Sequence, residues 1–325
     1  MAQEKPVAEI GLLIYPDCQM AAVYGLTDLF RIAGEWAGRI IEAEVPAIRV
    51  SHWKARDEGA VTCVWDSHPG APHRLTHAIA PPSIVMPEAM RPMPAAAAWM
   101  NACHAEGTIV CSVCAGAFVL AETGLINGRR ATTHWAFARQ LAERFPEVEL
   151  AEERMLVDEG DILTAGGILA WTDLGLTLVE RLMGPGVMLA TARFLLIDPP
   201  RRHQSPFSQF APRFDHGDAA VLRAQRHIHA RHAEPLGVGD LATLAGLTER
   251  TFLRRFRGAT GFRPVEYLQQ VRVAKAREAL ELTKQSIDRI AWLVGYGDPA
   301  AFRKVFQRIT GLTPNLYRQR FGIAR

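Results

Sequence analysis

Residues 1–197 alternate short apolar runs with longer stretches in which apolar residues recur at helical spacing. Short apolar or β-branched runs predict buried strands, and spacings of three and four residues predict amphipathic helices. The predicted strands are 8–15, 48–53, 61–65, 83–86, 108–113 and 162–164, and the predicted helices are 20–33, 95–104, 115–123, 136–145 and 171–183. This alternation predicts an α/β fold with a mostly parallel sheet, which binds ligands at the carboxyl ends of its strands.

The last ninety residues contain one helical unit twice, at an offset of 49 to 50 residues. The matching landmarks are Leu241 and Ile290, Gly246 and Gly295, Phe252 and Phe302, Phe256 and Phe306, Gly261 and Gly311, Pro264 and Pro314, and Tyr267 and Tyr317. Each copy reads as a helix, a glycine-containing turn and a second helix, which is the pattern of a helix-turn-helix. A long amphipathic helix over 265–282 is predicted to join the copies.

Charge divides the chain at the same place. Residues 218–325 carry 19 of the chain's 37 Lys and Arg but only 9 of its 34 Asp and Glu, which leaves 18 basic and 25 acidic residues before them. A basic domain behind an acidic body indicates that the basic part meets a polyanion. Residues 198–217 are rich in proline near their start and lack periodicity, which predicts a linker. We therefore expect a body at 1–197, a linker at 198–217 and a basic helical domain at 218–325.

The second helix of each copy is predicted to be a recognition helix in the major groove of DNA. In the first copy, Phe252 and Phe256 form an apolar face, and Arg250 and Arg254 lie opposite. The side chains expected at DNA are Glu249, Arg250, Thr251 and Arg254 in the first copy and Pro299, Ala300, Arg303 and Lys304 in the second. Arginine reads guanine through two hydrogen bonds, whereas Pro and Ala offer none to bases. We expect the first helix to read sequence and the second to contact phosphates and thymine methyls.

Candidate chemistry in the body centres on one strand-to-helix junction. Cys114 follows the strand 108–113 directly, and Ala115 and Gly116 after it allow a tight turn that exposes the sulfur. A following helix N-terminus is expected to lower the pKa of the thiol. His134, within Thr133-His134-Trp135, is the second member of a Cys–His pair, which is the minimum for nucleophilic catalysis. The spacing of Cys114 and His134 alone favours structural roles for both.

The segment from Ile109 to Trp135 resembles the ThiJ/PfpI branch of the class I glutamine-amidotransferase-like superfamily, and the likeness extends over residues 7–197. The resemblance implies a flavodoxin-like, doubly wound parallel sheet, with Cys114 as the elbow cysteine and His134 as the histidine of the Thr-Thr-His-Trp motif. This sequence departs from the family at the acid of the first helix, where Ala22 stands. Neither Asp17 nor Asp28 is in register to replace it, so we expect no catalytic residues and treat Cys114 and His134 as vestigial.

Residues 219–321 resemble the AraC/XylS-type DNA-binding domain, through Ile290-Ala291, Gly295-Tyr296, Phe302, Phe306, Gly311, Pro314 and Tyr317-Arg318. The two resemblances together identify a member of the GlxA-like transcription regulators. They imply a homodimer that binds double-stranded operator DNA, meets RNA polymerase, and responds to a small-molecule effector. The expected effector pocket is lined by Cys114, Ala115, Thr133, His134 and Trp135.

Two other functions stay open at this point. One is a cysteine-dependent enzyme of hydrolase, hydratase or glyoxalase type with a DNA-binding tail, and the other is a body that only dimerises. We expect no cofactor and no metal, because the eleven histidines lack metal-ligand spacing. No apolar run is long enough to span a membrane, and the first residues do not read as a signal peptide. The odd number of five cysteines fits a reducing compartment, so we expect a cytoplasmic protein.

Overall fold

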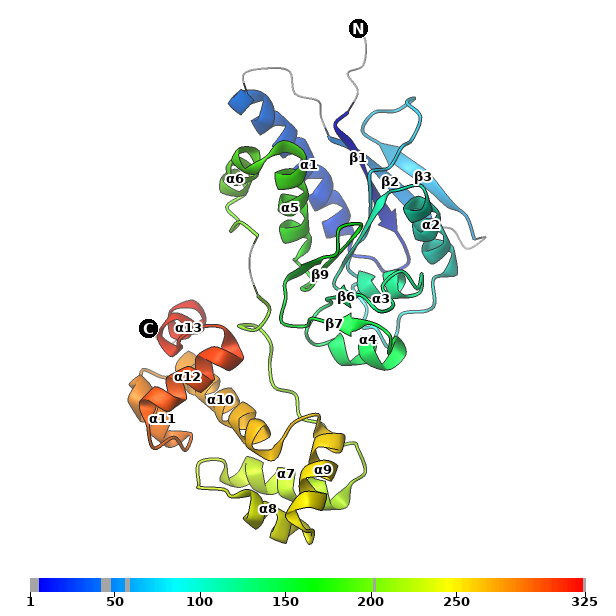
Figure 1. Ribbon diagram of the computed structural model, residues 1–325. Helices are drawn as coiled ribbons and strands as arrows, with labels where there is room; N and C mark the ends of the chain where they lie inside the picture. Colours follow the sequence, from blue (N-terminus) through cyan, green and yellow to red (C-terminus); the bar gives the residue numbers. More distant parts are fainter. Residues whose placement is uncertain (1–5, 42–47, 56–58, 201–202, 324–325) are drawn as a thin grey trace. The chain divides into compact units, whose positions relative to one another are not determined.

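The computed structural model describes residues 6–41, 48–55, 59–200 and 203–323 (Figure 1). The chain divides into two compact units, an N-terminal unit of residues 1–204 and a C-terminal unit of residues 205–325. None of the helices in the described ranges is long and apolar enough to cross a membrane.

The N-terminal unit is built on a seven-stranded sheet in the order β3-β2-β1-β4-β5-β9-β8. The parallel strands are β1 (Ala8–Ile14), β2 (Ile48–Ala55), β4 (His77–Ala80), β5 (Ile109–Val113) and β9 (Ile162–Ala165), and the antiparallel edge strands are β3 (Val61–Asp66) and β8 (Leu156–Asp158). The strand order reverses at β1, which pairs with both β2 and β4. This confirms the predicted α/β class with a mostly parallel sheet.

Helices cover both faces of this sheet (Figure 1). They are α1 (Met20–Ile41), α2 (Pro94–Ala105), α3 (Gly116–Ala121), α4 (Ala138–Arg144), α5 (Trp171–Met183) and α6 (Pro185–Phe194), and a separate two-stranded ladder joins β6 (Arg130–Ala131) to β7 (Glu149–Leu150). Helices α1, α5 and α6 pack on one another. Gly175 permits the close approach of α5 to α1, because a Cβ atom there would lie 3.0 Å from side-chain carbons of Leu26 and Leu29.

Two predictions about these elements are wrong. The strand expected at 83–86 lies earlier in the chain, at β4. It ends before Pro81 and Pro82, because proline has no N–H group to donate to a neighbouring strand. Ile84, in the predicted strand, is 67% exposed. The first helix does not end before Gly34. It continues to Ile41, since Ala33 and Ala37 keep its buried face intact across the glycine, and an interior glycine costs a helix only about 1 kcal/mol.

Helices are the only regular elements among the described residues of the C-terminal unit. Its helices are α7 (Ala219–Arg231), α8 (Val238–Ala245), α9 (Glu249–Thr260), α10 (Pro264–Leu282), α11 (Ile287–Leu293), α12 (Pro299–Thr310) and α13 (Pro314–Phe321). Two separate apolar cores form on the long helix α10. The first contains Phe252 and Phe256, and the second contains Phe302 and Phe306. All four rings are fully buried, which confirms the expected core faces of both second helices.

Local capping explains where the two second helices begin. The Thr248 hydroxyl accepts a hydrogen bond from the Thr251 N–H at the start of α9, and Asp298 accepts from the Ala300 and Ala301 N–H groups at the start of α12. Such caps satisfy donors that have no partner within the helix. Gly246 ends α8 with a φ of 70°, a conformation that glycine adopts without strain. The sequence therefore specifies both helix-turn-helix units locally.

We expect the two cores to respond separately to cavity formation. Phe252→Ala and Phe302→Ala should each cost about 3–5 kcal/mol of stability. Hydrogen exchange should then show lost protection mainly in α7–α9 for the first variant and mainly in α11–α13 for the second. Leu253→Ala, on the exposed side of α9, is the control and should change little. Equal loss of protection throughout the unit in both variants would contradict two separate cores.

Candidate functional site

The strand-to-helix junction at the end of β5 holds Cys114 in a strained conformation. Its φ is 54°, in the left-handed region that L-residues occupy at a cost of about 1–2 kcal/mol. The Cys114 N–H donates to the Ala165 carbonyl at 2.8 Å, and its carbonyl accepts from the Thr133 hydroxyl at 2.8 Å. The neighbouring segments therefore hold the turn from both sides. Strain of this kind is often kept at functional sites.

Glycine is required at the first position of α3. A Cβ atom on Gly116 would lie 2.4 Å from the Ala80 carbonyl oxygen and 2.6 Å from that of Pro81. The backbone of the junction thus lies directly against the end of β4. The small residues that the sequence places after Cys114 serve this close approach.

The expected lowering of the Cys114 pKa is wrong. Burial raises the pKa of this thiol to about 12, and the Ala115 N–H opposes that shift only weakly. The helix that follows has six residues, and Cys114 is 1% exposed. Loss of water around the sulfur therefore outweighs the helix N-terminus. Cys114 is a neutral thiol at pH 7, whereas cysteine nucleophiles react as thiolates.

His134 does not form a pair with Cys114. Its Nδ1 accepts a hydrogen bond from the Ala136 N–H at 3.1 Å, and its ring lies against Trp135 and Phe137 at centroid distances of 5.3 Å and 5.0 Å. Burial lowers the pKa of His134, which favours its neutral imidazole. No hydrogen bond joins His134 to Cys114 in the described part of the chain. The expected pocket residues thus form two groups: Cys114, Ala115 and Thr133 are buried together, while His134 and Trp135 stack at half-exposed positions.

Among the described residues, no carboxylate contributes to the pKa of Cys114, and Ala22, where the resemblance places the family's acid, is fully buried. The polar group near the thiol is instead Tyr15, which donates to the Pro81 carbonyl at 2.5 Å. Burial raises the pKa of Tyr15, with smaller contributions from Cys18 and Cys114. Tyr15 and Cys18, at the end of β1, therefore lie near the elbow. Tyr15 ends the predicted strand 8–15, and no motif in the sequence singles out Cys18.

Gln204 is a further residue at this site that the sequence did not reveal. Its side chain is 2% exposed; its Oε1 accepts from the Trp135 N–H at 3.1 Å, and its Nε2 donates to the Thr133 carbonyl at 2.8 Å. A Cβ atom on Gly166 would lie 2.2 Å from the Gln204 amide nitrogen, so only glycine leaves room there. Gln204 therefore holds the backbone of the predicted pocket segment.

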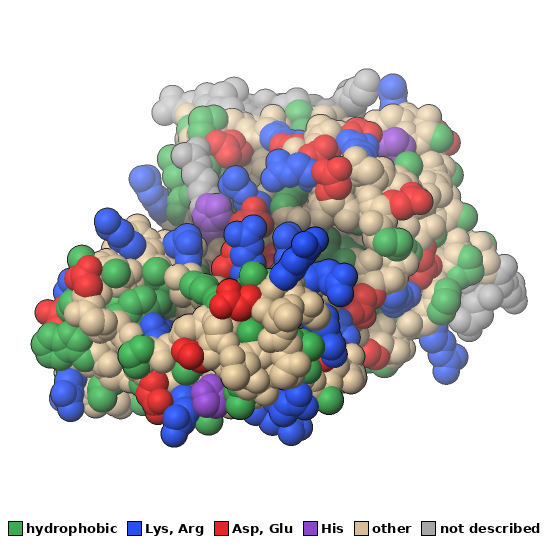
Figure 2. All heavy atoms as spheres, turned by 60° about the horizontal axis from the view of Figure 1, so that its bottom comes forward, with side chains coloured by type: hydrophobic (Ala, Val, Ile, Leu, Met, Phe, Trp, Pro, Cys, Tyr) green, Lys and Arg blue, Asp and Glu red, His purple; other side chains and the backbone are tan. Residues whose placement is uncertain are grey.

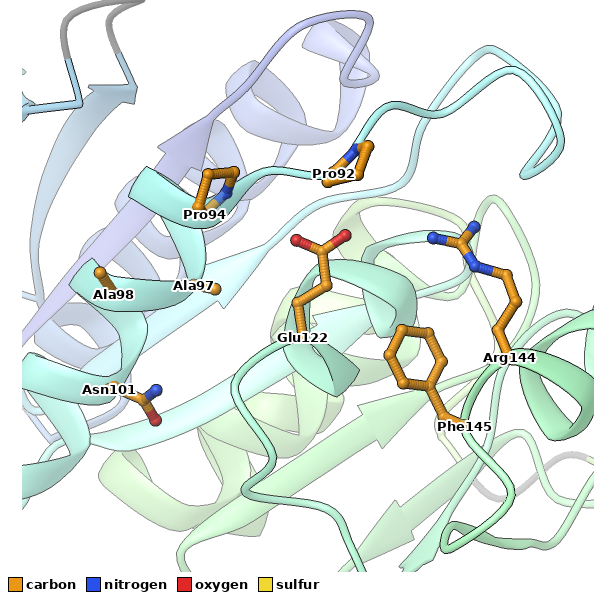
Figure 3. Close-up of a pocket in the computed structure, with 8 residues that line it drawn as sticks. All are labelled: Pro92, Pro94, Ala97, Ala98, Asn101, Glu122, Arg144 and Phe145. Atoms are coloured by element: carbon orange, nitrogen blue, oxygen red, sulfur yellow. The ribbon is translucent and has the colours of Figure 1, made fainter.

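A cavity of about 740 Å³ lies elsewhere in the N-terminal unit, among α2, α3 and α4 (Figure 3). Both of its charged side chains already support the fold. Glu122 accepts the Met93 N–H at 2.7 Å, and the Arg144 guanidinium lies over the rings of Phe118 and Phe145. Among the described residues, none of the expected pocket residues lines this cavity.

Helix α9 presents two unpaired arginines to solvent. Because Phe252 and Phe256 are buried, Arg250 and Arg254 lie on the exposed side, and neither has a hydrogen bond or ion pair among the described residues. Arg255 has a different role: its Nε and Nη2 donate to the Asp218 carboxylate at 2.8 Å and 2.7 Å. Of the other residues expected at DNA, Glu249 is exposed, and Thr251 is half-buried in the helix cap.

Helix α12 offers fewer free donors. Arg303 is exposed, but its Nη2 lies 2.5 Å from the Asp288 carboxylate of α11. Lys304 is exposed and without a partner in the described ranges, while Ala300 is exposed and Pro299 half-buried. Figure 2 shows Lys and Arg side chains that project from the surface at several places.

Both units have relatives among known proteins. Residues 84–181 match the DJ-1/PfpI family, and residues 241–320 match a helix-turn-helix domain family. The HTH-type transcriptional regulator GlxA of Rhizobium meliloti is 30% identical over 217 residues, which are 66% of this chain and 67% of that protein. The HTH-type transcriptional regulator CdhR of Pseudomonas aeruginosa is 28% identical over 225 residues, 68% of this chain and 66% of that protein.

The chain is therefore a DNA-binding transcription regulator that combines a DJ-1/PfpI domain with an AraC-type helix-turn-helix domain. It belongs to the GlxA-type HTH regulator family, as the sequence predicted. The DJ-1/PfpI family also contains enzymes: the isonitrile hydratase of Pseudomonas putida is 34% identical over 122 residues, 38% of this chain and 50% of that enzyme.

The raised pKa of Cys114 leads to a test of its reactivity. With iodoacetamide at pH 7.5, we expect Cys63 to be alkylated first, because it is the one described cysteine that is partly exposed. Cys114 should stay unmodified over the same time, and all five cysteines should react after denaturation in urea. Mass spectrometry of peptides gives the rates. Alkylation of Cys114 as fast as that of Cys63 would show an accessible, activated thiol.

Proposed function

We propose that this protein is a cytoplasmic, homodimeric regulator whose residues 218–325 bind operator DNA and whose residues 1–197 sense a small metabolite, with 198–217 connecting them. The exposure of Arg250 and Arg254 on α9, opposite the buried Phe252 and Phe256, is the observation that supports DNA reading most directly. Arginines on such a face can reach guanine edges in the major groove. RNA polymerase is the expected further partner at the promoter.

The two recognition helices contribute differently in this proposal. Helix α9 reads base sequence through Arg250 and Arg254, with Glu249 and Thr251 beside them. Helix α12 supplies phosphate contacts from Lys304 and Arg303 and apolar contacts from Pro299 and Ala300. The ion pair between Arg303 and Asp288 supports this assignment, because a guanidinium held by a carboxylate has fewer donors left for a base edge.

A comparison of two substitutions tests the division of roles. In binding-site selection with the full chain, Arg250→Ala should relax the preference at one base position and cost about 1–3 kcal/mol on the preferred duplex. Arg303→Ala should weaken binding to all duplexes alike and reduce the salt dependence by about one phosphate contact. Arg226→Ala, an exposed arginine on α7, serves as the control. Identical selection profiles for Arg250→Ala and Arg303→Ala would refute the assignment.

We propose that the N-terminal unit binds rather than transforms its ligand, at the elbow formed by Cys114, Ala115, Thr133, His134 and Trp135. Burial raises the pKa of the Cys114 thiol, and Ala22 stands in the position of the family's acid. The Nδ1 atom of His134 already accepts a hydrogen bond from the Ala136 N–H. These observations favour a binding pocket over a nucleophilic site. A cysteine-dependent enzyme is the second candidate, favoured by the strained turn at Cys114; turnover of glyoxals, amides or isonitriles that Cys114→Ala abolishes would establish it.

Gln204 provides a route by which that pocket influences the C-terminal unit. Its amide bonds to the Thr133 carbonyl and the Trp135 N–H, and the next residue in the chain is Ser205. The Ser205 carbonyl accepts a hydrogen bond at 3.0 Å from Arg277, a buried residue of α10. A ligand that moves the 133–135 segment would therefore also move Gln204, which is bonded covalently to Ser205 of the C-terminal unit. Such a response requires different ligand affinities in the two states.

A thermal-shift screen of small metabolites tests the pocket. A ligand present at 100 times its Kd should stabilise the folded protein by about 2.7 kcal/mol. Its effect should be lost in His134→Ala and Trp135→Ala and retained in Arg254→Ala. A shift that survives both pocket variants would place the ligand elsewhere, and the absence of any stabilising metabolite would favour a body that only dimerises.

A further inference from the structure

The two helix-turn-helix units share one connecting helix but no core. Tyr267, Leu268 and Val271 of α10 belong to the first core, whereas Val273, Ala276 and Leu280 belong to the second. Each unit is therefore packed independently on its own half of α10. The relative placement of α9 and α12 depends on α10 itself and on contacts where the two halves meet.

Arg272 lies at that junction, between the last α10 residue of the first core and the first α10 residue of the second. Its Nε donates to the His232 carbonyl at 2.7 Å and its Nη2 to the Glu234 carbonyl at 3.0 Å. Both acceptors belong to the loop between α7 and α8 in the first half. One guanidinium thus fixes that loop to the connecting helix through two charge-assisted hydrogen bonds.

The same guanidinium also contacts the second half. It lies 5.3 Å from the centroid of the Tyr296 ring, in the turn between α11 and α12. The Tyr296 ring in turn packs on Phe302 of α12 at a centroid distance of 5.5 Å. A cation over an aromatic face is attracted to it, and more strongly when partly desolvated. Arg272 therefore connects the first half to the helix that the second half presents to DNA.

An independent feature marks the same junction. Gly295 has a φ of 92°, and a Cβ atom there would lie 2.7 Å from the Ala233 carbonyl oxygen and 2.8 Å from its Cα. The turn of the second unit and the α7–α8 loop of the first thus meet backbone to backbone, beside the two carbonyls that Arg272 holds. Only glycine permits this approach.

We propose that Arg272 is a positioning residue that holds the separation and rotation of α9 relative to α12, and so helps to set the spacing of the two DNA elements that one chain recognises. The inference rests on the proposed DNA reading by these helices. One additional base pair between the elements moves them apart by about 3.4 Å and rotates one against the other by about 35°. With the junction fixed, both helices cannot follow this change.

The test uses the full chain and a duplex that the wild type selects from a random pool. Affinities are measured for that duplex, for one with a single base pair inserted between the two elements, and for one with only the α9 element intact. We expect the insertion to cost the wild type at least about tenfold in Kd. In Arg272→Met, which keeps the length of the side chain but removes its donors, the insertion should cost less than about threefold.

Three comparisons separate positioning from general weakening. Arg272→Met should keep the wild-type affinity for the single-element duplex, and Arg272→Lys should recover part of the insertion penalty. Lys275→Met is the matched control on the exposed side of α10 and should behave as the wild type. Gly295→Ala perturbs the junction from the other half and should also reduce the penalty, so it decides the question if thermal melting shows that Arg272→Met is unfolded.

Two results would overturn the inference. The first is a full insertion penalty in folded Arg272→Met or, where that variant does not fold, in Gly295→Ala. The second is an equal loss of affinity on all three duplexes. A wild type that selects no duplex would instead overturn the proposed function, together with this inference.

Discussion

The burial of two phenylalanines one turn apart on the second helix of each helix-turn-helix unit determines which face of that helix is exposed. Phe252 and Phe256 are fully buried in the first core, and Phe302 and Phe306 are fully buried in the second. A helix with a buried stripe must turn its opposite face to solvent. On α9 that face carries Arg250 and Arg254, neither of which has a partner among the described residues. On α12 it carries Lys304, together with an Arg303 that Asp288 already holds. One packing constraint, used twice, therefore yields two surfaces with different chemistry.

The N-terminal unit keeps the geometry of a nucleophile elbow without the electrostatics of one. The positive φ of Cys114 and the contact of Gly116 with the end of β4 preserve the tight turn. Burial nevertheless keeps the thiol protonated, and His134 is engaged with its own neighbours. These features favour the proposed binding role over nucleophilic chemistry. The buried Gln204 side chain joins the 133–135 segment to the end of the N-terminal unit.

The features of the fold that depend on local periodicity could be predicted from the sequence. The repeat located both helix-turn-helix units, and the alternation of elements indicated the parallel sheet. Prediction from the sequence failed where contacts between distant residues determine the structure. Strand β4, with the sequence His-Ala-Ile-Ala, has too little apolar pattern to be found, and the helix past Gly34 is held by packing on α5 and α6. The pKa of Cys114 depends on burial by the whole unit. The roles of Gln204 and Arg272 depend on partners about 40 to 70 residues away in the chain. No local pattern could show them.

The dependence of the full chain's affinity for duplex DNA on salt and competitor concentration tests whether the C-terminal helices read base sequence. We expect a selected duplex that the protein prefers over random competitor, with log K falling linearly as log salt concentration rises, by about 0.9 per phosphate contacted. Arg250→Ala and Arg254→Ala together should remove the preference while leaving most of the salt dependence. Binding that shows no preference for any duplex over random competitor, at any salt concentration, would show that these helices do not read base sequence.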